Sequence, residues 1–396
     1  MTQRRDFLKA GAVFTALSRD RILGANDRIR IAGIGTGGRG TYLLGLVAKA
    51  EKTEIVALCD AYEPRRLATR DKLAPGARDY TDYREVLERH DIDAVVVGSP
   101  DHWHVPMTID AVAAGKDVYV EKPVSHTIEE GERVEKAVTA SKQIVQVGYQ
   151  QRSWDHFIAA RDIVTGGKLG QVTLVLTSWY QDYLSGMGAT PSIDTAKLDW
   201  KRFLGSAPAQ PFDALRYTRW RWFWDFGGGH LTDLYSHYGD VVHWYMNQSA
   251  PRAAVASGGR NAIPAFECPD TINTAWEYDG FNIVYDGALN GSLDGGNIIF
   301  RGSRATMKIN RDGFAVYPEG VIKRELTSYP PPEASMRSSG DGTITHMQNF
   351  LDCVRSRRQP NAGITIAVAI ARAAHIGNMA YRKGARIDAT ALGGQG

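Results

Sequence analysis

The sequence is poor in cysteine, in long apolar runs and in charge of one sign. Its 396 residues include three cysteines and no C-x-x-C pair, so we expect neither a disulfide framework nor a zinc site built on thiolates. No segment approaches the roughly 20 apolar residues of a membrane span. Lys and Arg number 47 against 44 Asp and Glu, without a basic block, so we expect neither a membrane nor a nucleic acid as partner.

The rest of the composition is that of a globular protein. Hydrophobic residues make up 43% and charged residues 23%, which is enough for a sizeable core. At roughly 100–200 residues per domain, the length predicts two or three domains. A near-neutral charge is compatible with an uncharged, carbohydrate-like ligand.

The first residues resemble a twin-arginine export signal. Arg4 and Arg5 are followed by a Phe-Leu-Lys sequence at 7–9. The apolar stretch behind them, residues 10–17, lies at the short end for such a signal, and charged residues follow at 19–21. We expect residues 1–27 to be a leader, which would place the protein in the periplasm, or an N-terminal arm of a cytoplasmic protein.

A G-x-G-x-x-G sequence lies between a predicted strand at 28–34 and a helical pattern at 41–49. In a dinucleotide-binding turn, Gly33 would allow the tight bend and Gly35 would let the backbone approach the pyrophosphate. Gly38 would let the helix pack on the strand. The residues expected to contact a dinucleotide at this turn are Gly33, Gly35, Thr36, Gly37, Gly38 and Arg39.

An acidic residue follows the next predicted strand, at 54–58. Asp60 lies 22 positions after Gly38 (60 − 38), near the spacing of about 20 expected for an acid that binds the ribose hydroxyls. Its carboxylate would repel a 2′-phosphate. The sequence therefore favours NAD(H) over NADP(H) as cofactor, although Arg65 and Arg66 lie close behind.

Strands and helices continue to alternate up to about residue 150. Apolar runs at 94–97, 117–120 and 144–147 predict buried strands, and helical patterns separate them. This alternation is typical of a parallel, doubly wound sheet, which binds ligands at the carboxyl ends of its strands. At these strand ends, Trp103 is expected beside the substrate. The residues expected there beside the cofactor are Ser99, Pro100, His104, Glu121 and Lys122.

The pattern changes after residue 150. Runs at 172–180, 271–278, 282–285, 297–300 and 305–309, several of them joined by Asp-Gly turns, predict a largely antiparallel sheet. We therefore expect an α/β protein with a Rossmann domain at 28–150 and a substrate-binding domain at 151–396. An aromatic segment at 219–226, which includes Trp220, is interpreted either as core or as a wall of the substrate pocket.

A helix is predicted over residues 230–245. Asp233 and His237, four positions apart, would lie on one face. This pair can be an acid/base cluster, a structural pair or part of a metal site. We expect no metal, because a metal site usually requires a third, well-spaced ligand, and only His230 lies near enough to supply one.

These residues together resemble the glucose–fructose oxidoreductase/inositol dehydrogenase (Gfo/Idh/MocA) family. The resemblance covers about residues 28–388. It rests on the glycine turn, on Glu121-Lys122-Pro123 and on a Gly-Gly-Gly-x-x-x-Asp-x-x-x-His-x-x-Asp-x-x-x-Trp helix. It implies that Lys122 is the catalytic lysine beside the nicotinamide, with Asp233 and His237 as its partners from the second domain.

The family resemblance also implies an open sheet that often forms the interface of a homo-oligomer, here a dimer or tetramer. An exported member that travels with its cofactor would hold NAD(H) tightly. The family helix often has glycine two residues before the histidine, where this sequence has Tyr235. Tyr235 and His230 are therefore expected to reshape the rim of the pocket.

The residues predict hydride transfer between a carbinol carbon of a sugar, polyol or sugar derivative and nicotinamide C4. His237 would remove the hydroxyl proton, because histidine titrates near neutrality. Lys122 would stabilise charge on the reacting oxygen, and Asp233 would orient His237 or bind a neighbouring hydroxyl. The expected substrate-pocket residues are Trp103, Tyr149, Arg152, Trp220, His230 and Tyr235.

Two other functions stay open at the level of sequence. Some relatives resemble NAD-dependent glycosidases, which oxidise the sugar transiently, eliminate the aglycone, add water and reduce the product again with the same NAD. A non-catalytic sensor on the same scaffold is the third possibility. The complete set of Lys122, Asp233 and His237 argues against it.

Overall fold

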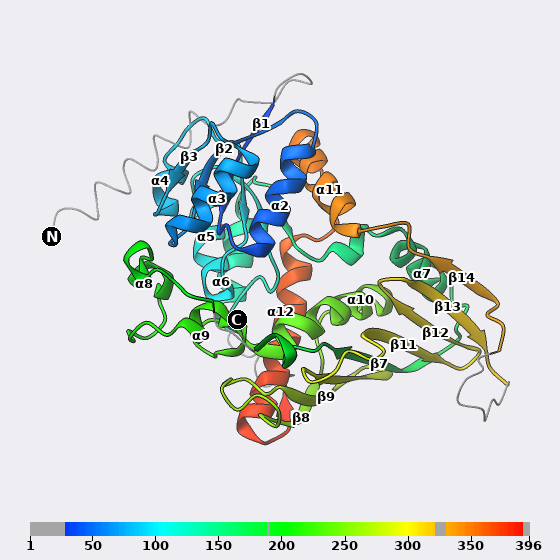
Figure 1. Ribbon diagram of the computed structural model, residues 1–396. Helices are drawn as coiled ribbons and strands as arrows, with labels where there is room; N and C mark the ends of the chain where they lie inside the picture. Colours follow the sequence, from blue (N-terminus) through cyan, green and yellow to red (C-terminus); the bar gives the residue numbers. More distant parts are fainter. Residues whose placement is uncertain (1–27, 188–190, 321–329, 391–396) are drawn as a thin grey trace.

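A computed structural model describes residues 28–187, 191–320 and 330–390 of the chain (Figure 1). The predicted leader at 1–27 lies outside the described residues, so export stays a prediction. In the described part of the chain, none of the helices combines the length and the apolar character needed to cross a bilayer.

The first sheet has six parallel strands in the order β3-β2-β1-β4-β5-β6. The chain order reverses between β1 and β4, which opens a ligand crevice at their carboxyl ends. The predicted Rossmann fold is therefore confirmed. The strands are β1 (Ile29–Ile34), β2 (Thr53–Cys59), β3 (Arg78–Tyr80), β4 (Ala94–Val97), β5 (Asp117–Val120) and β6 (Val145–Val147).

Helices cover both faces of this sheet. Each of the five helices from α2 to α6 lies between two consecutive strands of the sheet in the chain. Their apolar stripes are buried against Val- and Ile-rich strands, which is the pattern of a parallel sheet covered on both sides. The helices are α2 (Gly38–Lys49), α3 (Glu63–Leu73), α4 (Tyr83–Leu87), α5 (Asp101–Ala113) and α6 (Ile128–Thr139).

The second sheet has nine strands in the order β14-β13-β12-β11-β7-β10-β9-β8-β15. Only β7 and β10 pair in parallel, so the predicted, largely antiparallel sheet is confirmed. The strands are β7 (Val172–Tyr180), β8 (Ala253–Gly259), β9 (Thr271–Tyr278), β10 (Phe281–Ala288), β11 (Gly296–Gly302), β12 (Ala305–Asn310), β13 (Gly313–Pro318), β14 (Ala334–Arg337) and β15 (Ile387–Asp388).

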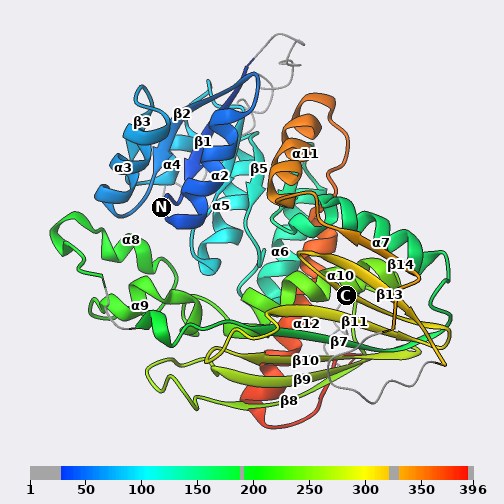
Figure 2. The ribbon, with the colours of Figure 1, turned by 45° about the vertical axis from the view of Figure 1, so that its right-hand side comes forward.

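Three helices pack on one face of this sheet (Figure 2). They are α7 (Asp155–Thr165), α10 (Ser236–Met246) and α12 (Ile364–Lys383). Buried and more exposed residues alternate along β9 and β10. This period of two leaves one face of the sheet toward solvent. The alternation agrees with an open sheet, while assembly through that face stays a prediction.

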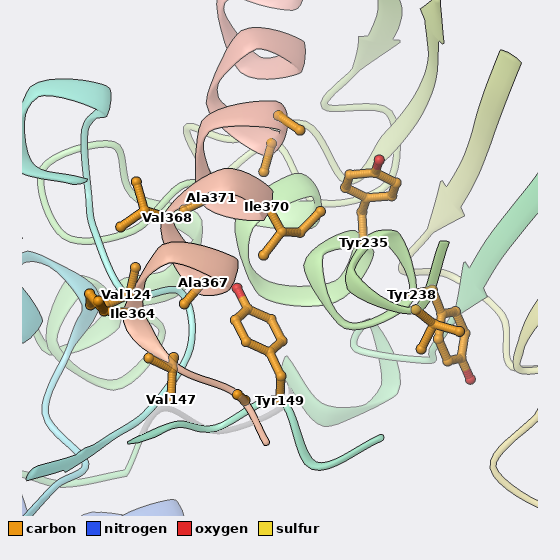
Figure 3. Packing of buried hydrophobic residues seen from close by; sticks show 14 of the residues in the cluster. Val124, Val147, Tyr149, Tyr235, Tyr238, Ile364, Ala367, Val368, Ile370 and Ala371 are labelled. Atoms are coloured by element: carbon orange, nitrogen blue, oxygen red, sulfur yellow. The ribbon is translucent and has the colours of Figure 1, made fainter. Parts of the chain in front are cut away.

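Helix α12 joins the two halves of the molecule. One continuous core runs from the first sheet past α12 to the second sheet. Figure 3 shows Ile364 and Val368 of α12 near Val124 from the first domain, with Val147 below them and Tyr235 of the second domain on the other side. The two domains are therefore held at a fixed spacing by shared apolar packing.

Helix α11 (Gly342–Ser356) returns from the second half of the chain to the first sheet, beside α2 (Figure 1). Met347, Phe350 and Leu351 are buried in one cluster with Leu43 and Tyr119 of the Rossmann domain. A boundary drawn at residue 150 therefore does not separate the two cores.

The segment between β7 and α10 also crosses to the Rossmann domain. It contains α8 (Trp200–Leu204) and α9 (Ala214–Thr218), which lie below α3 in Figure 2. Leu198 forms a β-bridge with Tyr62, and the Asp199 N–H donates to the Ala61 carbonyl at 2.9 Å. This segment covers the loop that follows β2.

We expect Phe350→Ala to destabilise the protein by about 3–5 kcal/mol, because a fully buried ring would leave a cavity between α11 and the first sheet. Chemical denaturation followed by circular dichroism measures the loss. Ile344→Ala on the same helix is the matched control, since that side chain is 56% exposed. Equal losses for the two variants would contradict the packing described for α11.

Candidate active site

The glycine turn after β1 has a different register from the one predicted. Gly35 has a φ of +84°, and a Cβ there would lie 2.6 Å from the Ser99 nitrogen. A Cβ on Gly40 would lie 1.9 Å from the Gly35 carbonyl oxygen, whereas a Cβ on Gly38 would meet no atom within 4 Å. The glycine that permits close packing is therefore Gly40, and the prediction for Gly38 is corrected.

Asp60 holds this turn from the end of β2. Its Oδ2 accepts hydrogen bonds from the Thr36 N–H at 2.7 Å and from the Thr36 hydroxyl at 3.1 Å. Arg66 is paired with Asp79 at 2.8 Å, and Arg65 stacks on the Tyr217 ring at 4.8 Å. Both guanidinium groups are thus engaged elsewhere, which favours NAD(H) over NADP(H).

The residues around the turn fit a dinucleotide. A Cβ on Gly37 would also meet open space, at the N-terminus of α2, where free N–H groups favour a phosphate. Ser99 Oγ and Arg39 Nη2 are buried polar atoms without a hydrogen-bond partner among the described residues. Such atoms commonly mark a ligand position. Pro100 is the N-cap of α5 at the same edge of the sheet.

Glu121 connects the turn to the end of β5. Its carboxylate accepts a hydrogen bond from Arg39 Nε at 2.8 Å, and both side chains belong to the crevice. Burial alone would raise the pKa of Glu121. The charges of Arg39 and Lys122 outweigh it and hold the pKa below its usual value. Glu121 is therefore an ionised anchor for Arg39.

Lys122 reaches from the Rossmann domain to the second domain. Its Nζ donates to the Asp233 backbone carbonyl at 2.6 Å and to Asp233 Oδ1 at 2.6 Å. Both side chains are less than a tenth exposed. The structure thus brings together two residues that lie 111 positions apart in the chain.

Asp233 is bonded differently from the prediction. Residues Leu231–Tyr235 form a π-helical turn, and the regular helix α10 begins only at Ser236. The wider turn changes the angle between Asp233 and His237, so their carboxylate and imidazole are not paired. Asp233 holds Lys122 and accepts from Arg221 Nε at 3.2 Å. The expectation that Asp233 orients His237 is corrected accordingly.

Two carboxyl groups near Lys122 have shifted pKa values. Burial would raise the pKa of Asp233, but Lys122 and Arg221 outweigh it and lower the pKa to about 2. Burial, together with the charge of Asp233, raises the pKa of Asp101 well above its usual value. Asp101 Oδ2 is buried without a hydrogen-bond partner. Asp233 and Asp101 therefore have pKa values shifted in opposite directions, as in sites that use carboxyl groups for different roles.

His237 lies against Trp179, with ring centroids 5.8 Å apart and planes inclined by 19°. Its Nδ1 is buried and has no hydrogen-bond partner among the described residues. Burial, followed by the charges of Lys122, Arg311 and Arg39, lowers the pKa of His237 well below its usual value. The imidazole is neutral at pH 7 and can accept a proton.

Two residues expected at the pocket rim belong to the core instead. Tyr235 is fully buried and stacks on Trp276, with centroids 4.1 Å apart. The His230 ring nitrogens lie 2.9 Å from the Tyr285 hydroxyl and 3.1 Å from the Asp270 carbonyl oxygen. Their hydrogen-bonding and packing partners lie within the second domain, so neither side chain shapes the crevice.

The side chains of four further candidates also contact other parts of the protein and do not line the crevice. Tyr149 is fully buried beside α12 (Figure 3), and Arg152 pairs with buried Asp240 at 2.9 Å. Trp103 donates from Nε1 to the Phe203 carbonyl at 2.9 Å, which fixes the α8 segment. The His104 ring lies between the carbonyls of Pro123 and Ser99, at 2.6 and 2.9 Å.

Trp220 remains beside the site. It is partly exposed, and the Arg221 guanidinium lies 4.2 Å from its ring centroid while bonding to Asp233. Sequence reasoning missed Gly40, Trp179 and Arg311, and it gave no chemical role to Asp101 or to Arg221 within the aromatic segment at 219–226. Gly40 alone had a local signal, since Gly35, Gly37 and Gly40 form a second G-x-G-x-x-G.

Within the described ranges, no group of three metal-ligating side chains gathers at one place.

The fold and the site define the class: a two-domain, NAD-binding oxidoreductase scaffold. Residues 29–149 match the family model described as "Oxidoreductase family, NAD-binding Rossmann fold". Residues 170–390 match the one described as "Oxidoreductase family, C-terminal alpha/beta domain". The chain therefore belongs to the Gfo/Idh/MocA oxidoreductase family, and the prediction of NAD(H) as cofactor is confirmed.

Curated relatives match parts of the chain. Inositol 2-dehydrogenase of Salmonella typhimurium is 32% identical over 146 residues, 37% of this chain and 43% of that enzyme. A glycosyl hydrolase family 109 protein of Solibacter usitatus is 30% identical over 230 residues, 51% of this chain and 50% of that protein. The chain thus spans half or less of the length of these relatives.

Solved structures share the fold over nearly the whole chain. Myo-inositol 2-dehydrogenase of Lactobacillus plantarum has a TM-score of 0.69 at 21% identity, covering 91% of this chain and 99% of that one. Scyllo-inositol dehydrogenase of Lactobacillus casei, with bound NAD(H) and scyllo-inositol, has a TM-score of 0.68 at 19% identity, covering 92% and 100%.

We expect Asp60→Ala to weaken NAD(H) binding by about 10- to 150-fold, because hydrogen bonds to a charged group are each worth about 1.5–3 kcal/mol. The loss of the carboxylate also narrows the preference for NAD(H) over NADP(H). Titration calorimetry with each cofactor measures both effects. Asp71→Ala is the control, since that side chain is 66% exposed. Unchanged affinities in Asp60→Ala would contradict the assignment.

We expect His237 to stay neutral as the pH falls through 6.5, because burial and three nearby cations lower its pKa. The proton is then taken up only at more acid pH. Nitrogen NMR of imidazole-labelled protein, with His237→Gln used to assign the signal, measures the midpoint. A midpoint at or above 6.5 would show that the ring is not buried among these charges.

Proposed function

We propose that the protein is an NAD(H)-dependent oxidoreductase that acts on a carbinol carbon of a sugar, polyol or sugar derivative. The observation that carries the proposal is the meeting of Lys122, from the end of β5, with Asp233 and His237 of the second domain. This meeting occurs at the carboxyl edge of the Rossmann sheet, beside the glycine turn. Membership of the oxidoreductase family and the named activities of its inositol-dehydrogenase relatives support it.

The two bonds from Lys122 to Asp233 fix the ammonium group in the crevice. There, Lys122 would donate a hydrogen bond to the reacting oxygen and stabilise the negative charge that develops on it. Bound NAD⁺ supplies the hydride acceptor, or NADH the donor in the reverse direction. Asp233 positions the lysine and does not take up a proton near neutral pH, because its pKa is about 2.

His237 would accept the hydroxyl proton as the hydride leaves. Its neutral imidazole is in the required state at pH 7, although its lowered pKa makes it a weak base before reaction. Charge developing on the substrate oxygen offsets the charge of Lys122. The basicity of His237 therefore rises as the reaction proceeds.

The second candidate is an NAD-dependent glycosidase with a recycled cofactor. Two observations favour keeping it. One is the match to a glycosyl hydrolase family 109 protein over 230 residues. The other is Asp101, a buried acid whose pKa burial and the charge of Asp233 raise, and which simple hydride transfer does not require. Elimination of an aglycone does require an additional proton donor.

A panel of free sugars, polyols and aryl glycosides tests the proposal, with NADH absorbance and aglycone release recorded together. We expect Lys122→Met to lower NADH formation at least about 100-fold, because one preorganised charge at the reacting oxygen is removed. Lys136→Met, at an exposed position of α6, is the control.

Wild-type turnover in Lys122→Met would contradict the proposal. Aglycone release that requires only catalytic amounts of NAD, without net NADH, would replace it by the glycosidase.

A further inference from the structure

Arg311 lies at the turn from β12 to β13, on the wall of the second domain that carries His237. Its guanidinium is 4.9 Å from the centroid of the Trp179 ring, and Trp179 stacks on His237. Arg311 is also among the cations whose charge acts on His237. The three side chains thus form a continuous row that leads away from the reacting position.

A hollow of about 580 Å³ opens beside this row. This volume falls in the range of small-molecule sites. Its lining includes Trp179, Tyr238, Asn297, Asn310 and Arg311. The charged residues Asp294, Asp312 and Lys308 also line it; the two acids are exposed to solvent, and Lys308 is half-buried.

Arg311 differs from the other cations of the crevice. Lys122 and Arg221 share Asp233, and Arg39 is paired with Glu121. Among residues 28–187, 191–320 and 330–390, no carboxylate lies within ion-pair distance of Arg311. Its Nε is buried and has no hydrogen-bond partner.

A partly buried guanidinium without a direct ion pair is unfavourable, because burial removes water and no carboxylate in contact replaces it. Burial and the charge of Arg39 lower the pKa of Arg311 by more than Tyr238, Asp341 and Asp233 raise it. Such an arrangement is stabilised when a ligand supplies the missing anion. A guanidinium presents parallel N–H groups that match the two oxygens of a carboxylate.

We propose that Arg311 binds a carboxylate on the substrate, so that the enzyme acts on a sugar acid in preference to the neutral sugar. This inference rests on the proposed oxidoreductase function. The carboxylate would lie along the Trp179 face, while a carbinol of the same molecule reaches Lys122 and His237. The phosphates of the cofactor are expected on the opposite wall, at the N-terminus of α2.

The test compares matched pairs of hexose and hexuronate, glucose with glucuronate and galactose with galacturonate. Binding to NADH-loaded protein is measured by calorimetry, and kcat/KM with NAD⁺ is measured by NADH absorbance. We expect the wild type to prefer the hexuronate of at least one pair. Arg311→Met is expected to lower that preference by about 10- to 150-fold, the worth of a hydrogen bond to a charged group.

Arg311→Lys keeps the positive charge but loses the parallel N–H groups of the guanidinium. Its preference for the hexuronate over the hexose is therefore expected to lie between those of the wild type and Arg311→Met. Arg301→Met, at an exposed position of β11 in the same sheet, is the matched control. Circular dichroism verifies that each variant is folded.

Equal affinity of the wild type for the two members of both pairs would overturn the inference. A loss of NAD(H) affinity in Arg311→Met as large as the loss of hexuronate affinity would also overturn it, since the anion would then belong to the cofactor. Preferential binding of a hexuronate without any NADH formation would contradict the proposed function and leave the assignment of Arg311 intact.

Discussion

The ion pair between Lys122 and Asp233 is the contact on which the site depends. It connects the end of a Rossmann strand to a π-helical turn of the second domain, and both partners are nearly buried. A buried ion pair is stable only when each charge is fully bonded, and removing one partner costs about 3–5 kcal/mol. The pair therefore sets the spacing of the two walls at the point where a substrate oxygen would bind.

The charges of the crevice follow from that pair. Lys122 and Arg221 keep Asp233 ionised, and ionised Asp233 in turn favours the protonated form of Asp101. Burial, followed by the charges of Lys122, Arg311 and Arg39, keeps His237 neutral. Two carboxyl groups of similar intrinsic acidity thus have pKa values shifted in opposite directions, which is an arrangement that acid/base chemistry uses.

Several elements could be predicted because their signals are local. The β9 and β7 strands follow the predicted ranges, since alternating and continuous apolar patterns directly reflect which faces are buried. The helix after the triple glycine at 227–229 shows where local sequence patterns no longer predict the structure. A π-helical turn at Leu231–Tyr235 has no simple periodicity, so one of the two predicted roles of Asp233, the orientation of His237, was wrong, while binding of a substrate hydroxyl stays a prediction. Tyr235 likewise became core, because Trp276 from a distant strand stacks on it.

The sequence by itself determined the parallel, doubly wound sheet and the glycine turn with Asp60 at the spacing of a ribose acid, while the grouping of Lys122, Asp233 and His237 came from the resemblance to the family. The sheet and the turn depend on short spacings, which are local signals. Only the tertiary structure decided that α11 returns to the first sheet, that Asp233 holds Lys122, and that Arg311 lies unpaired beside Trp179. Each of these depends on contacts between residues far apart in the chain, for which no local pattern exists.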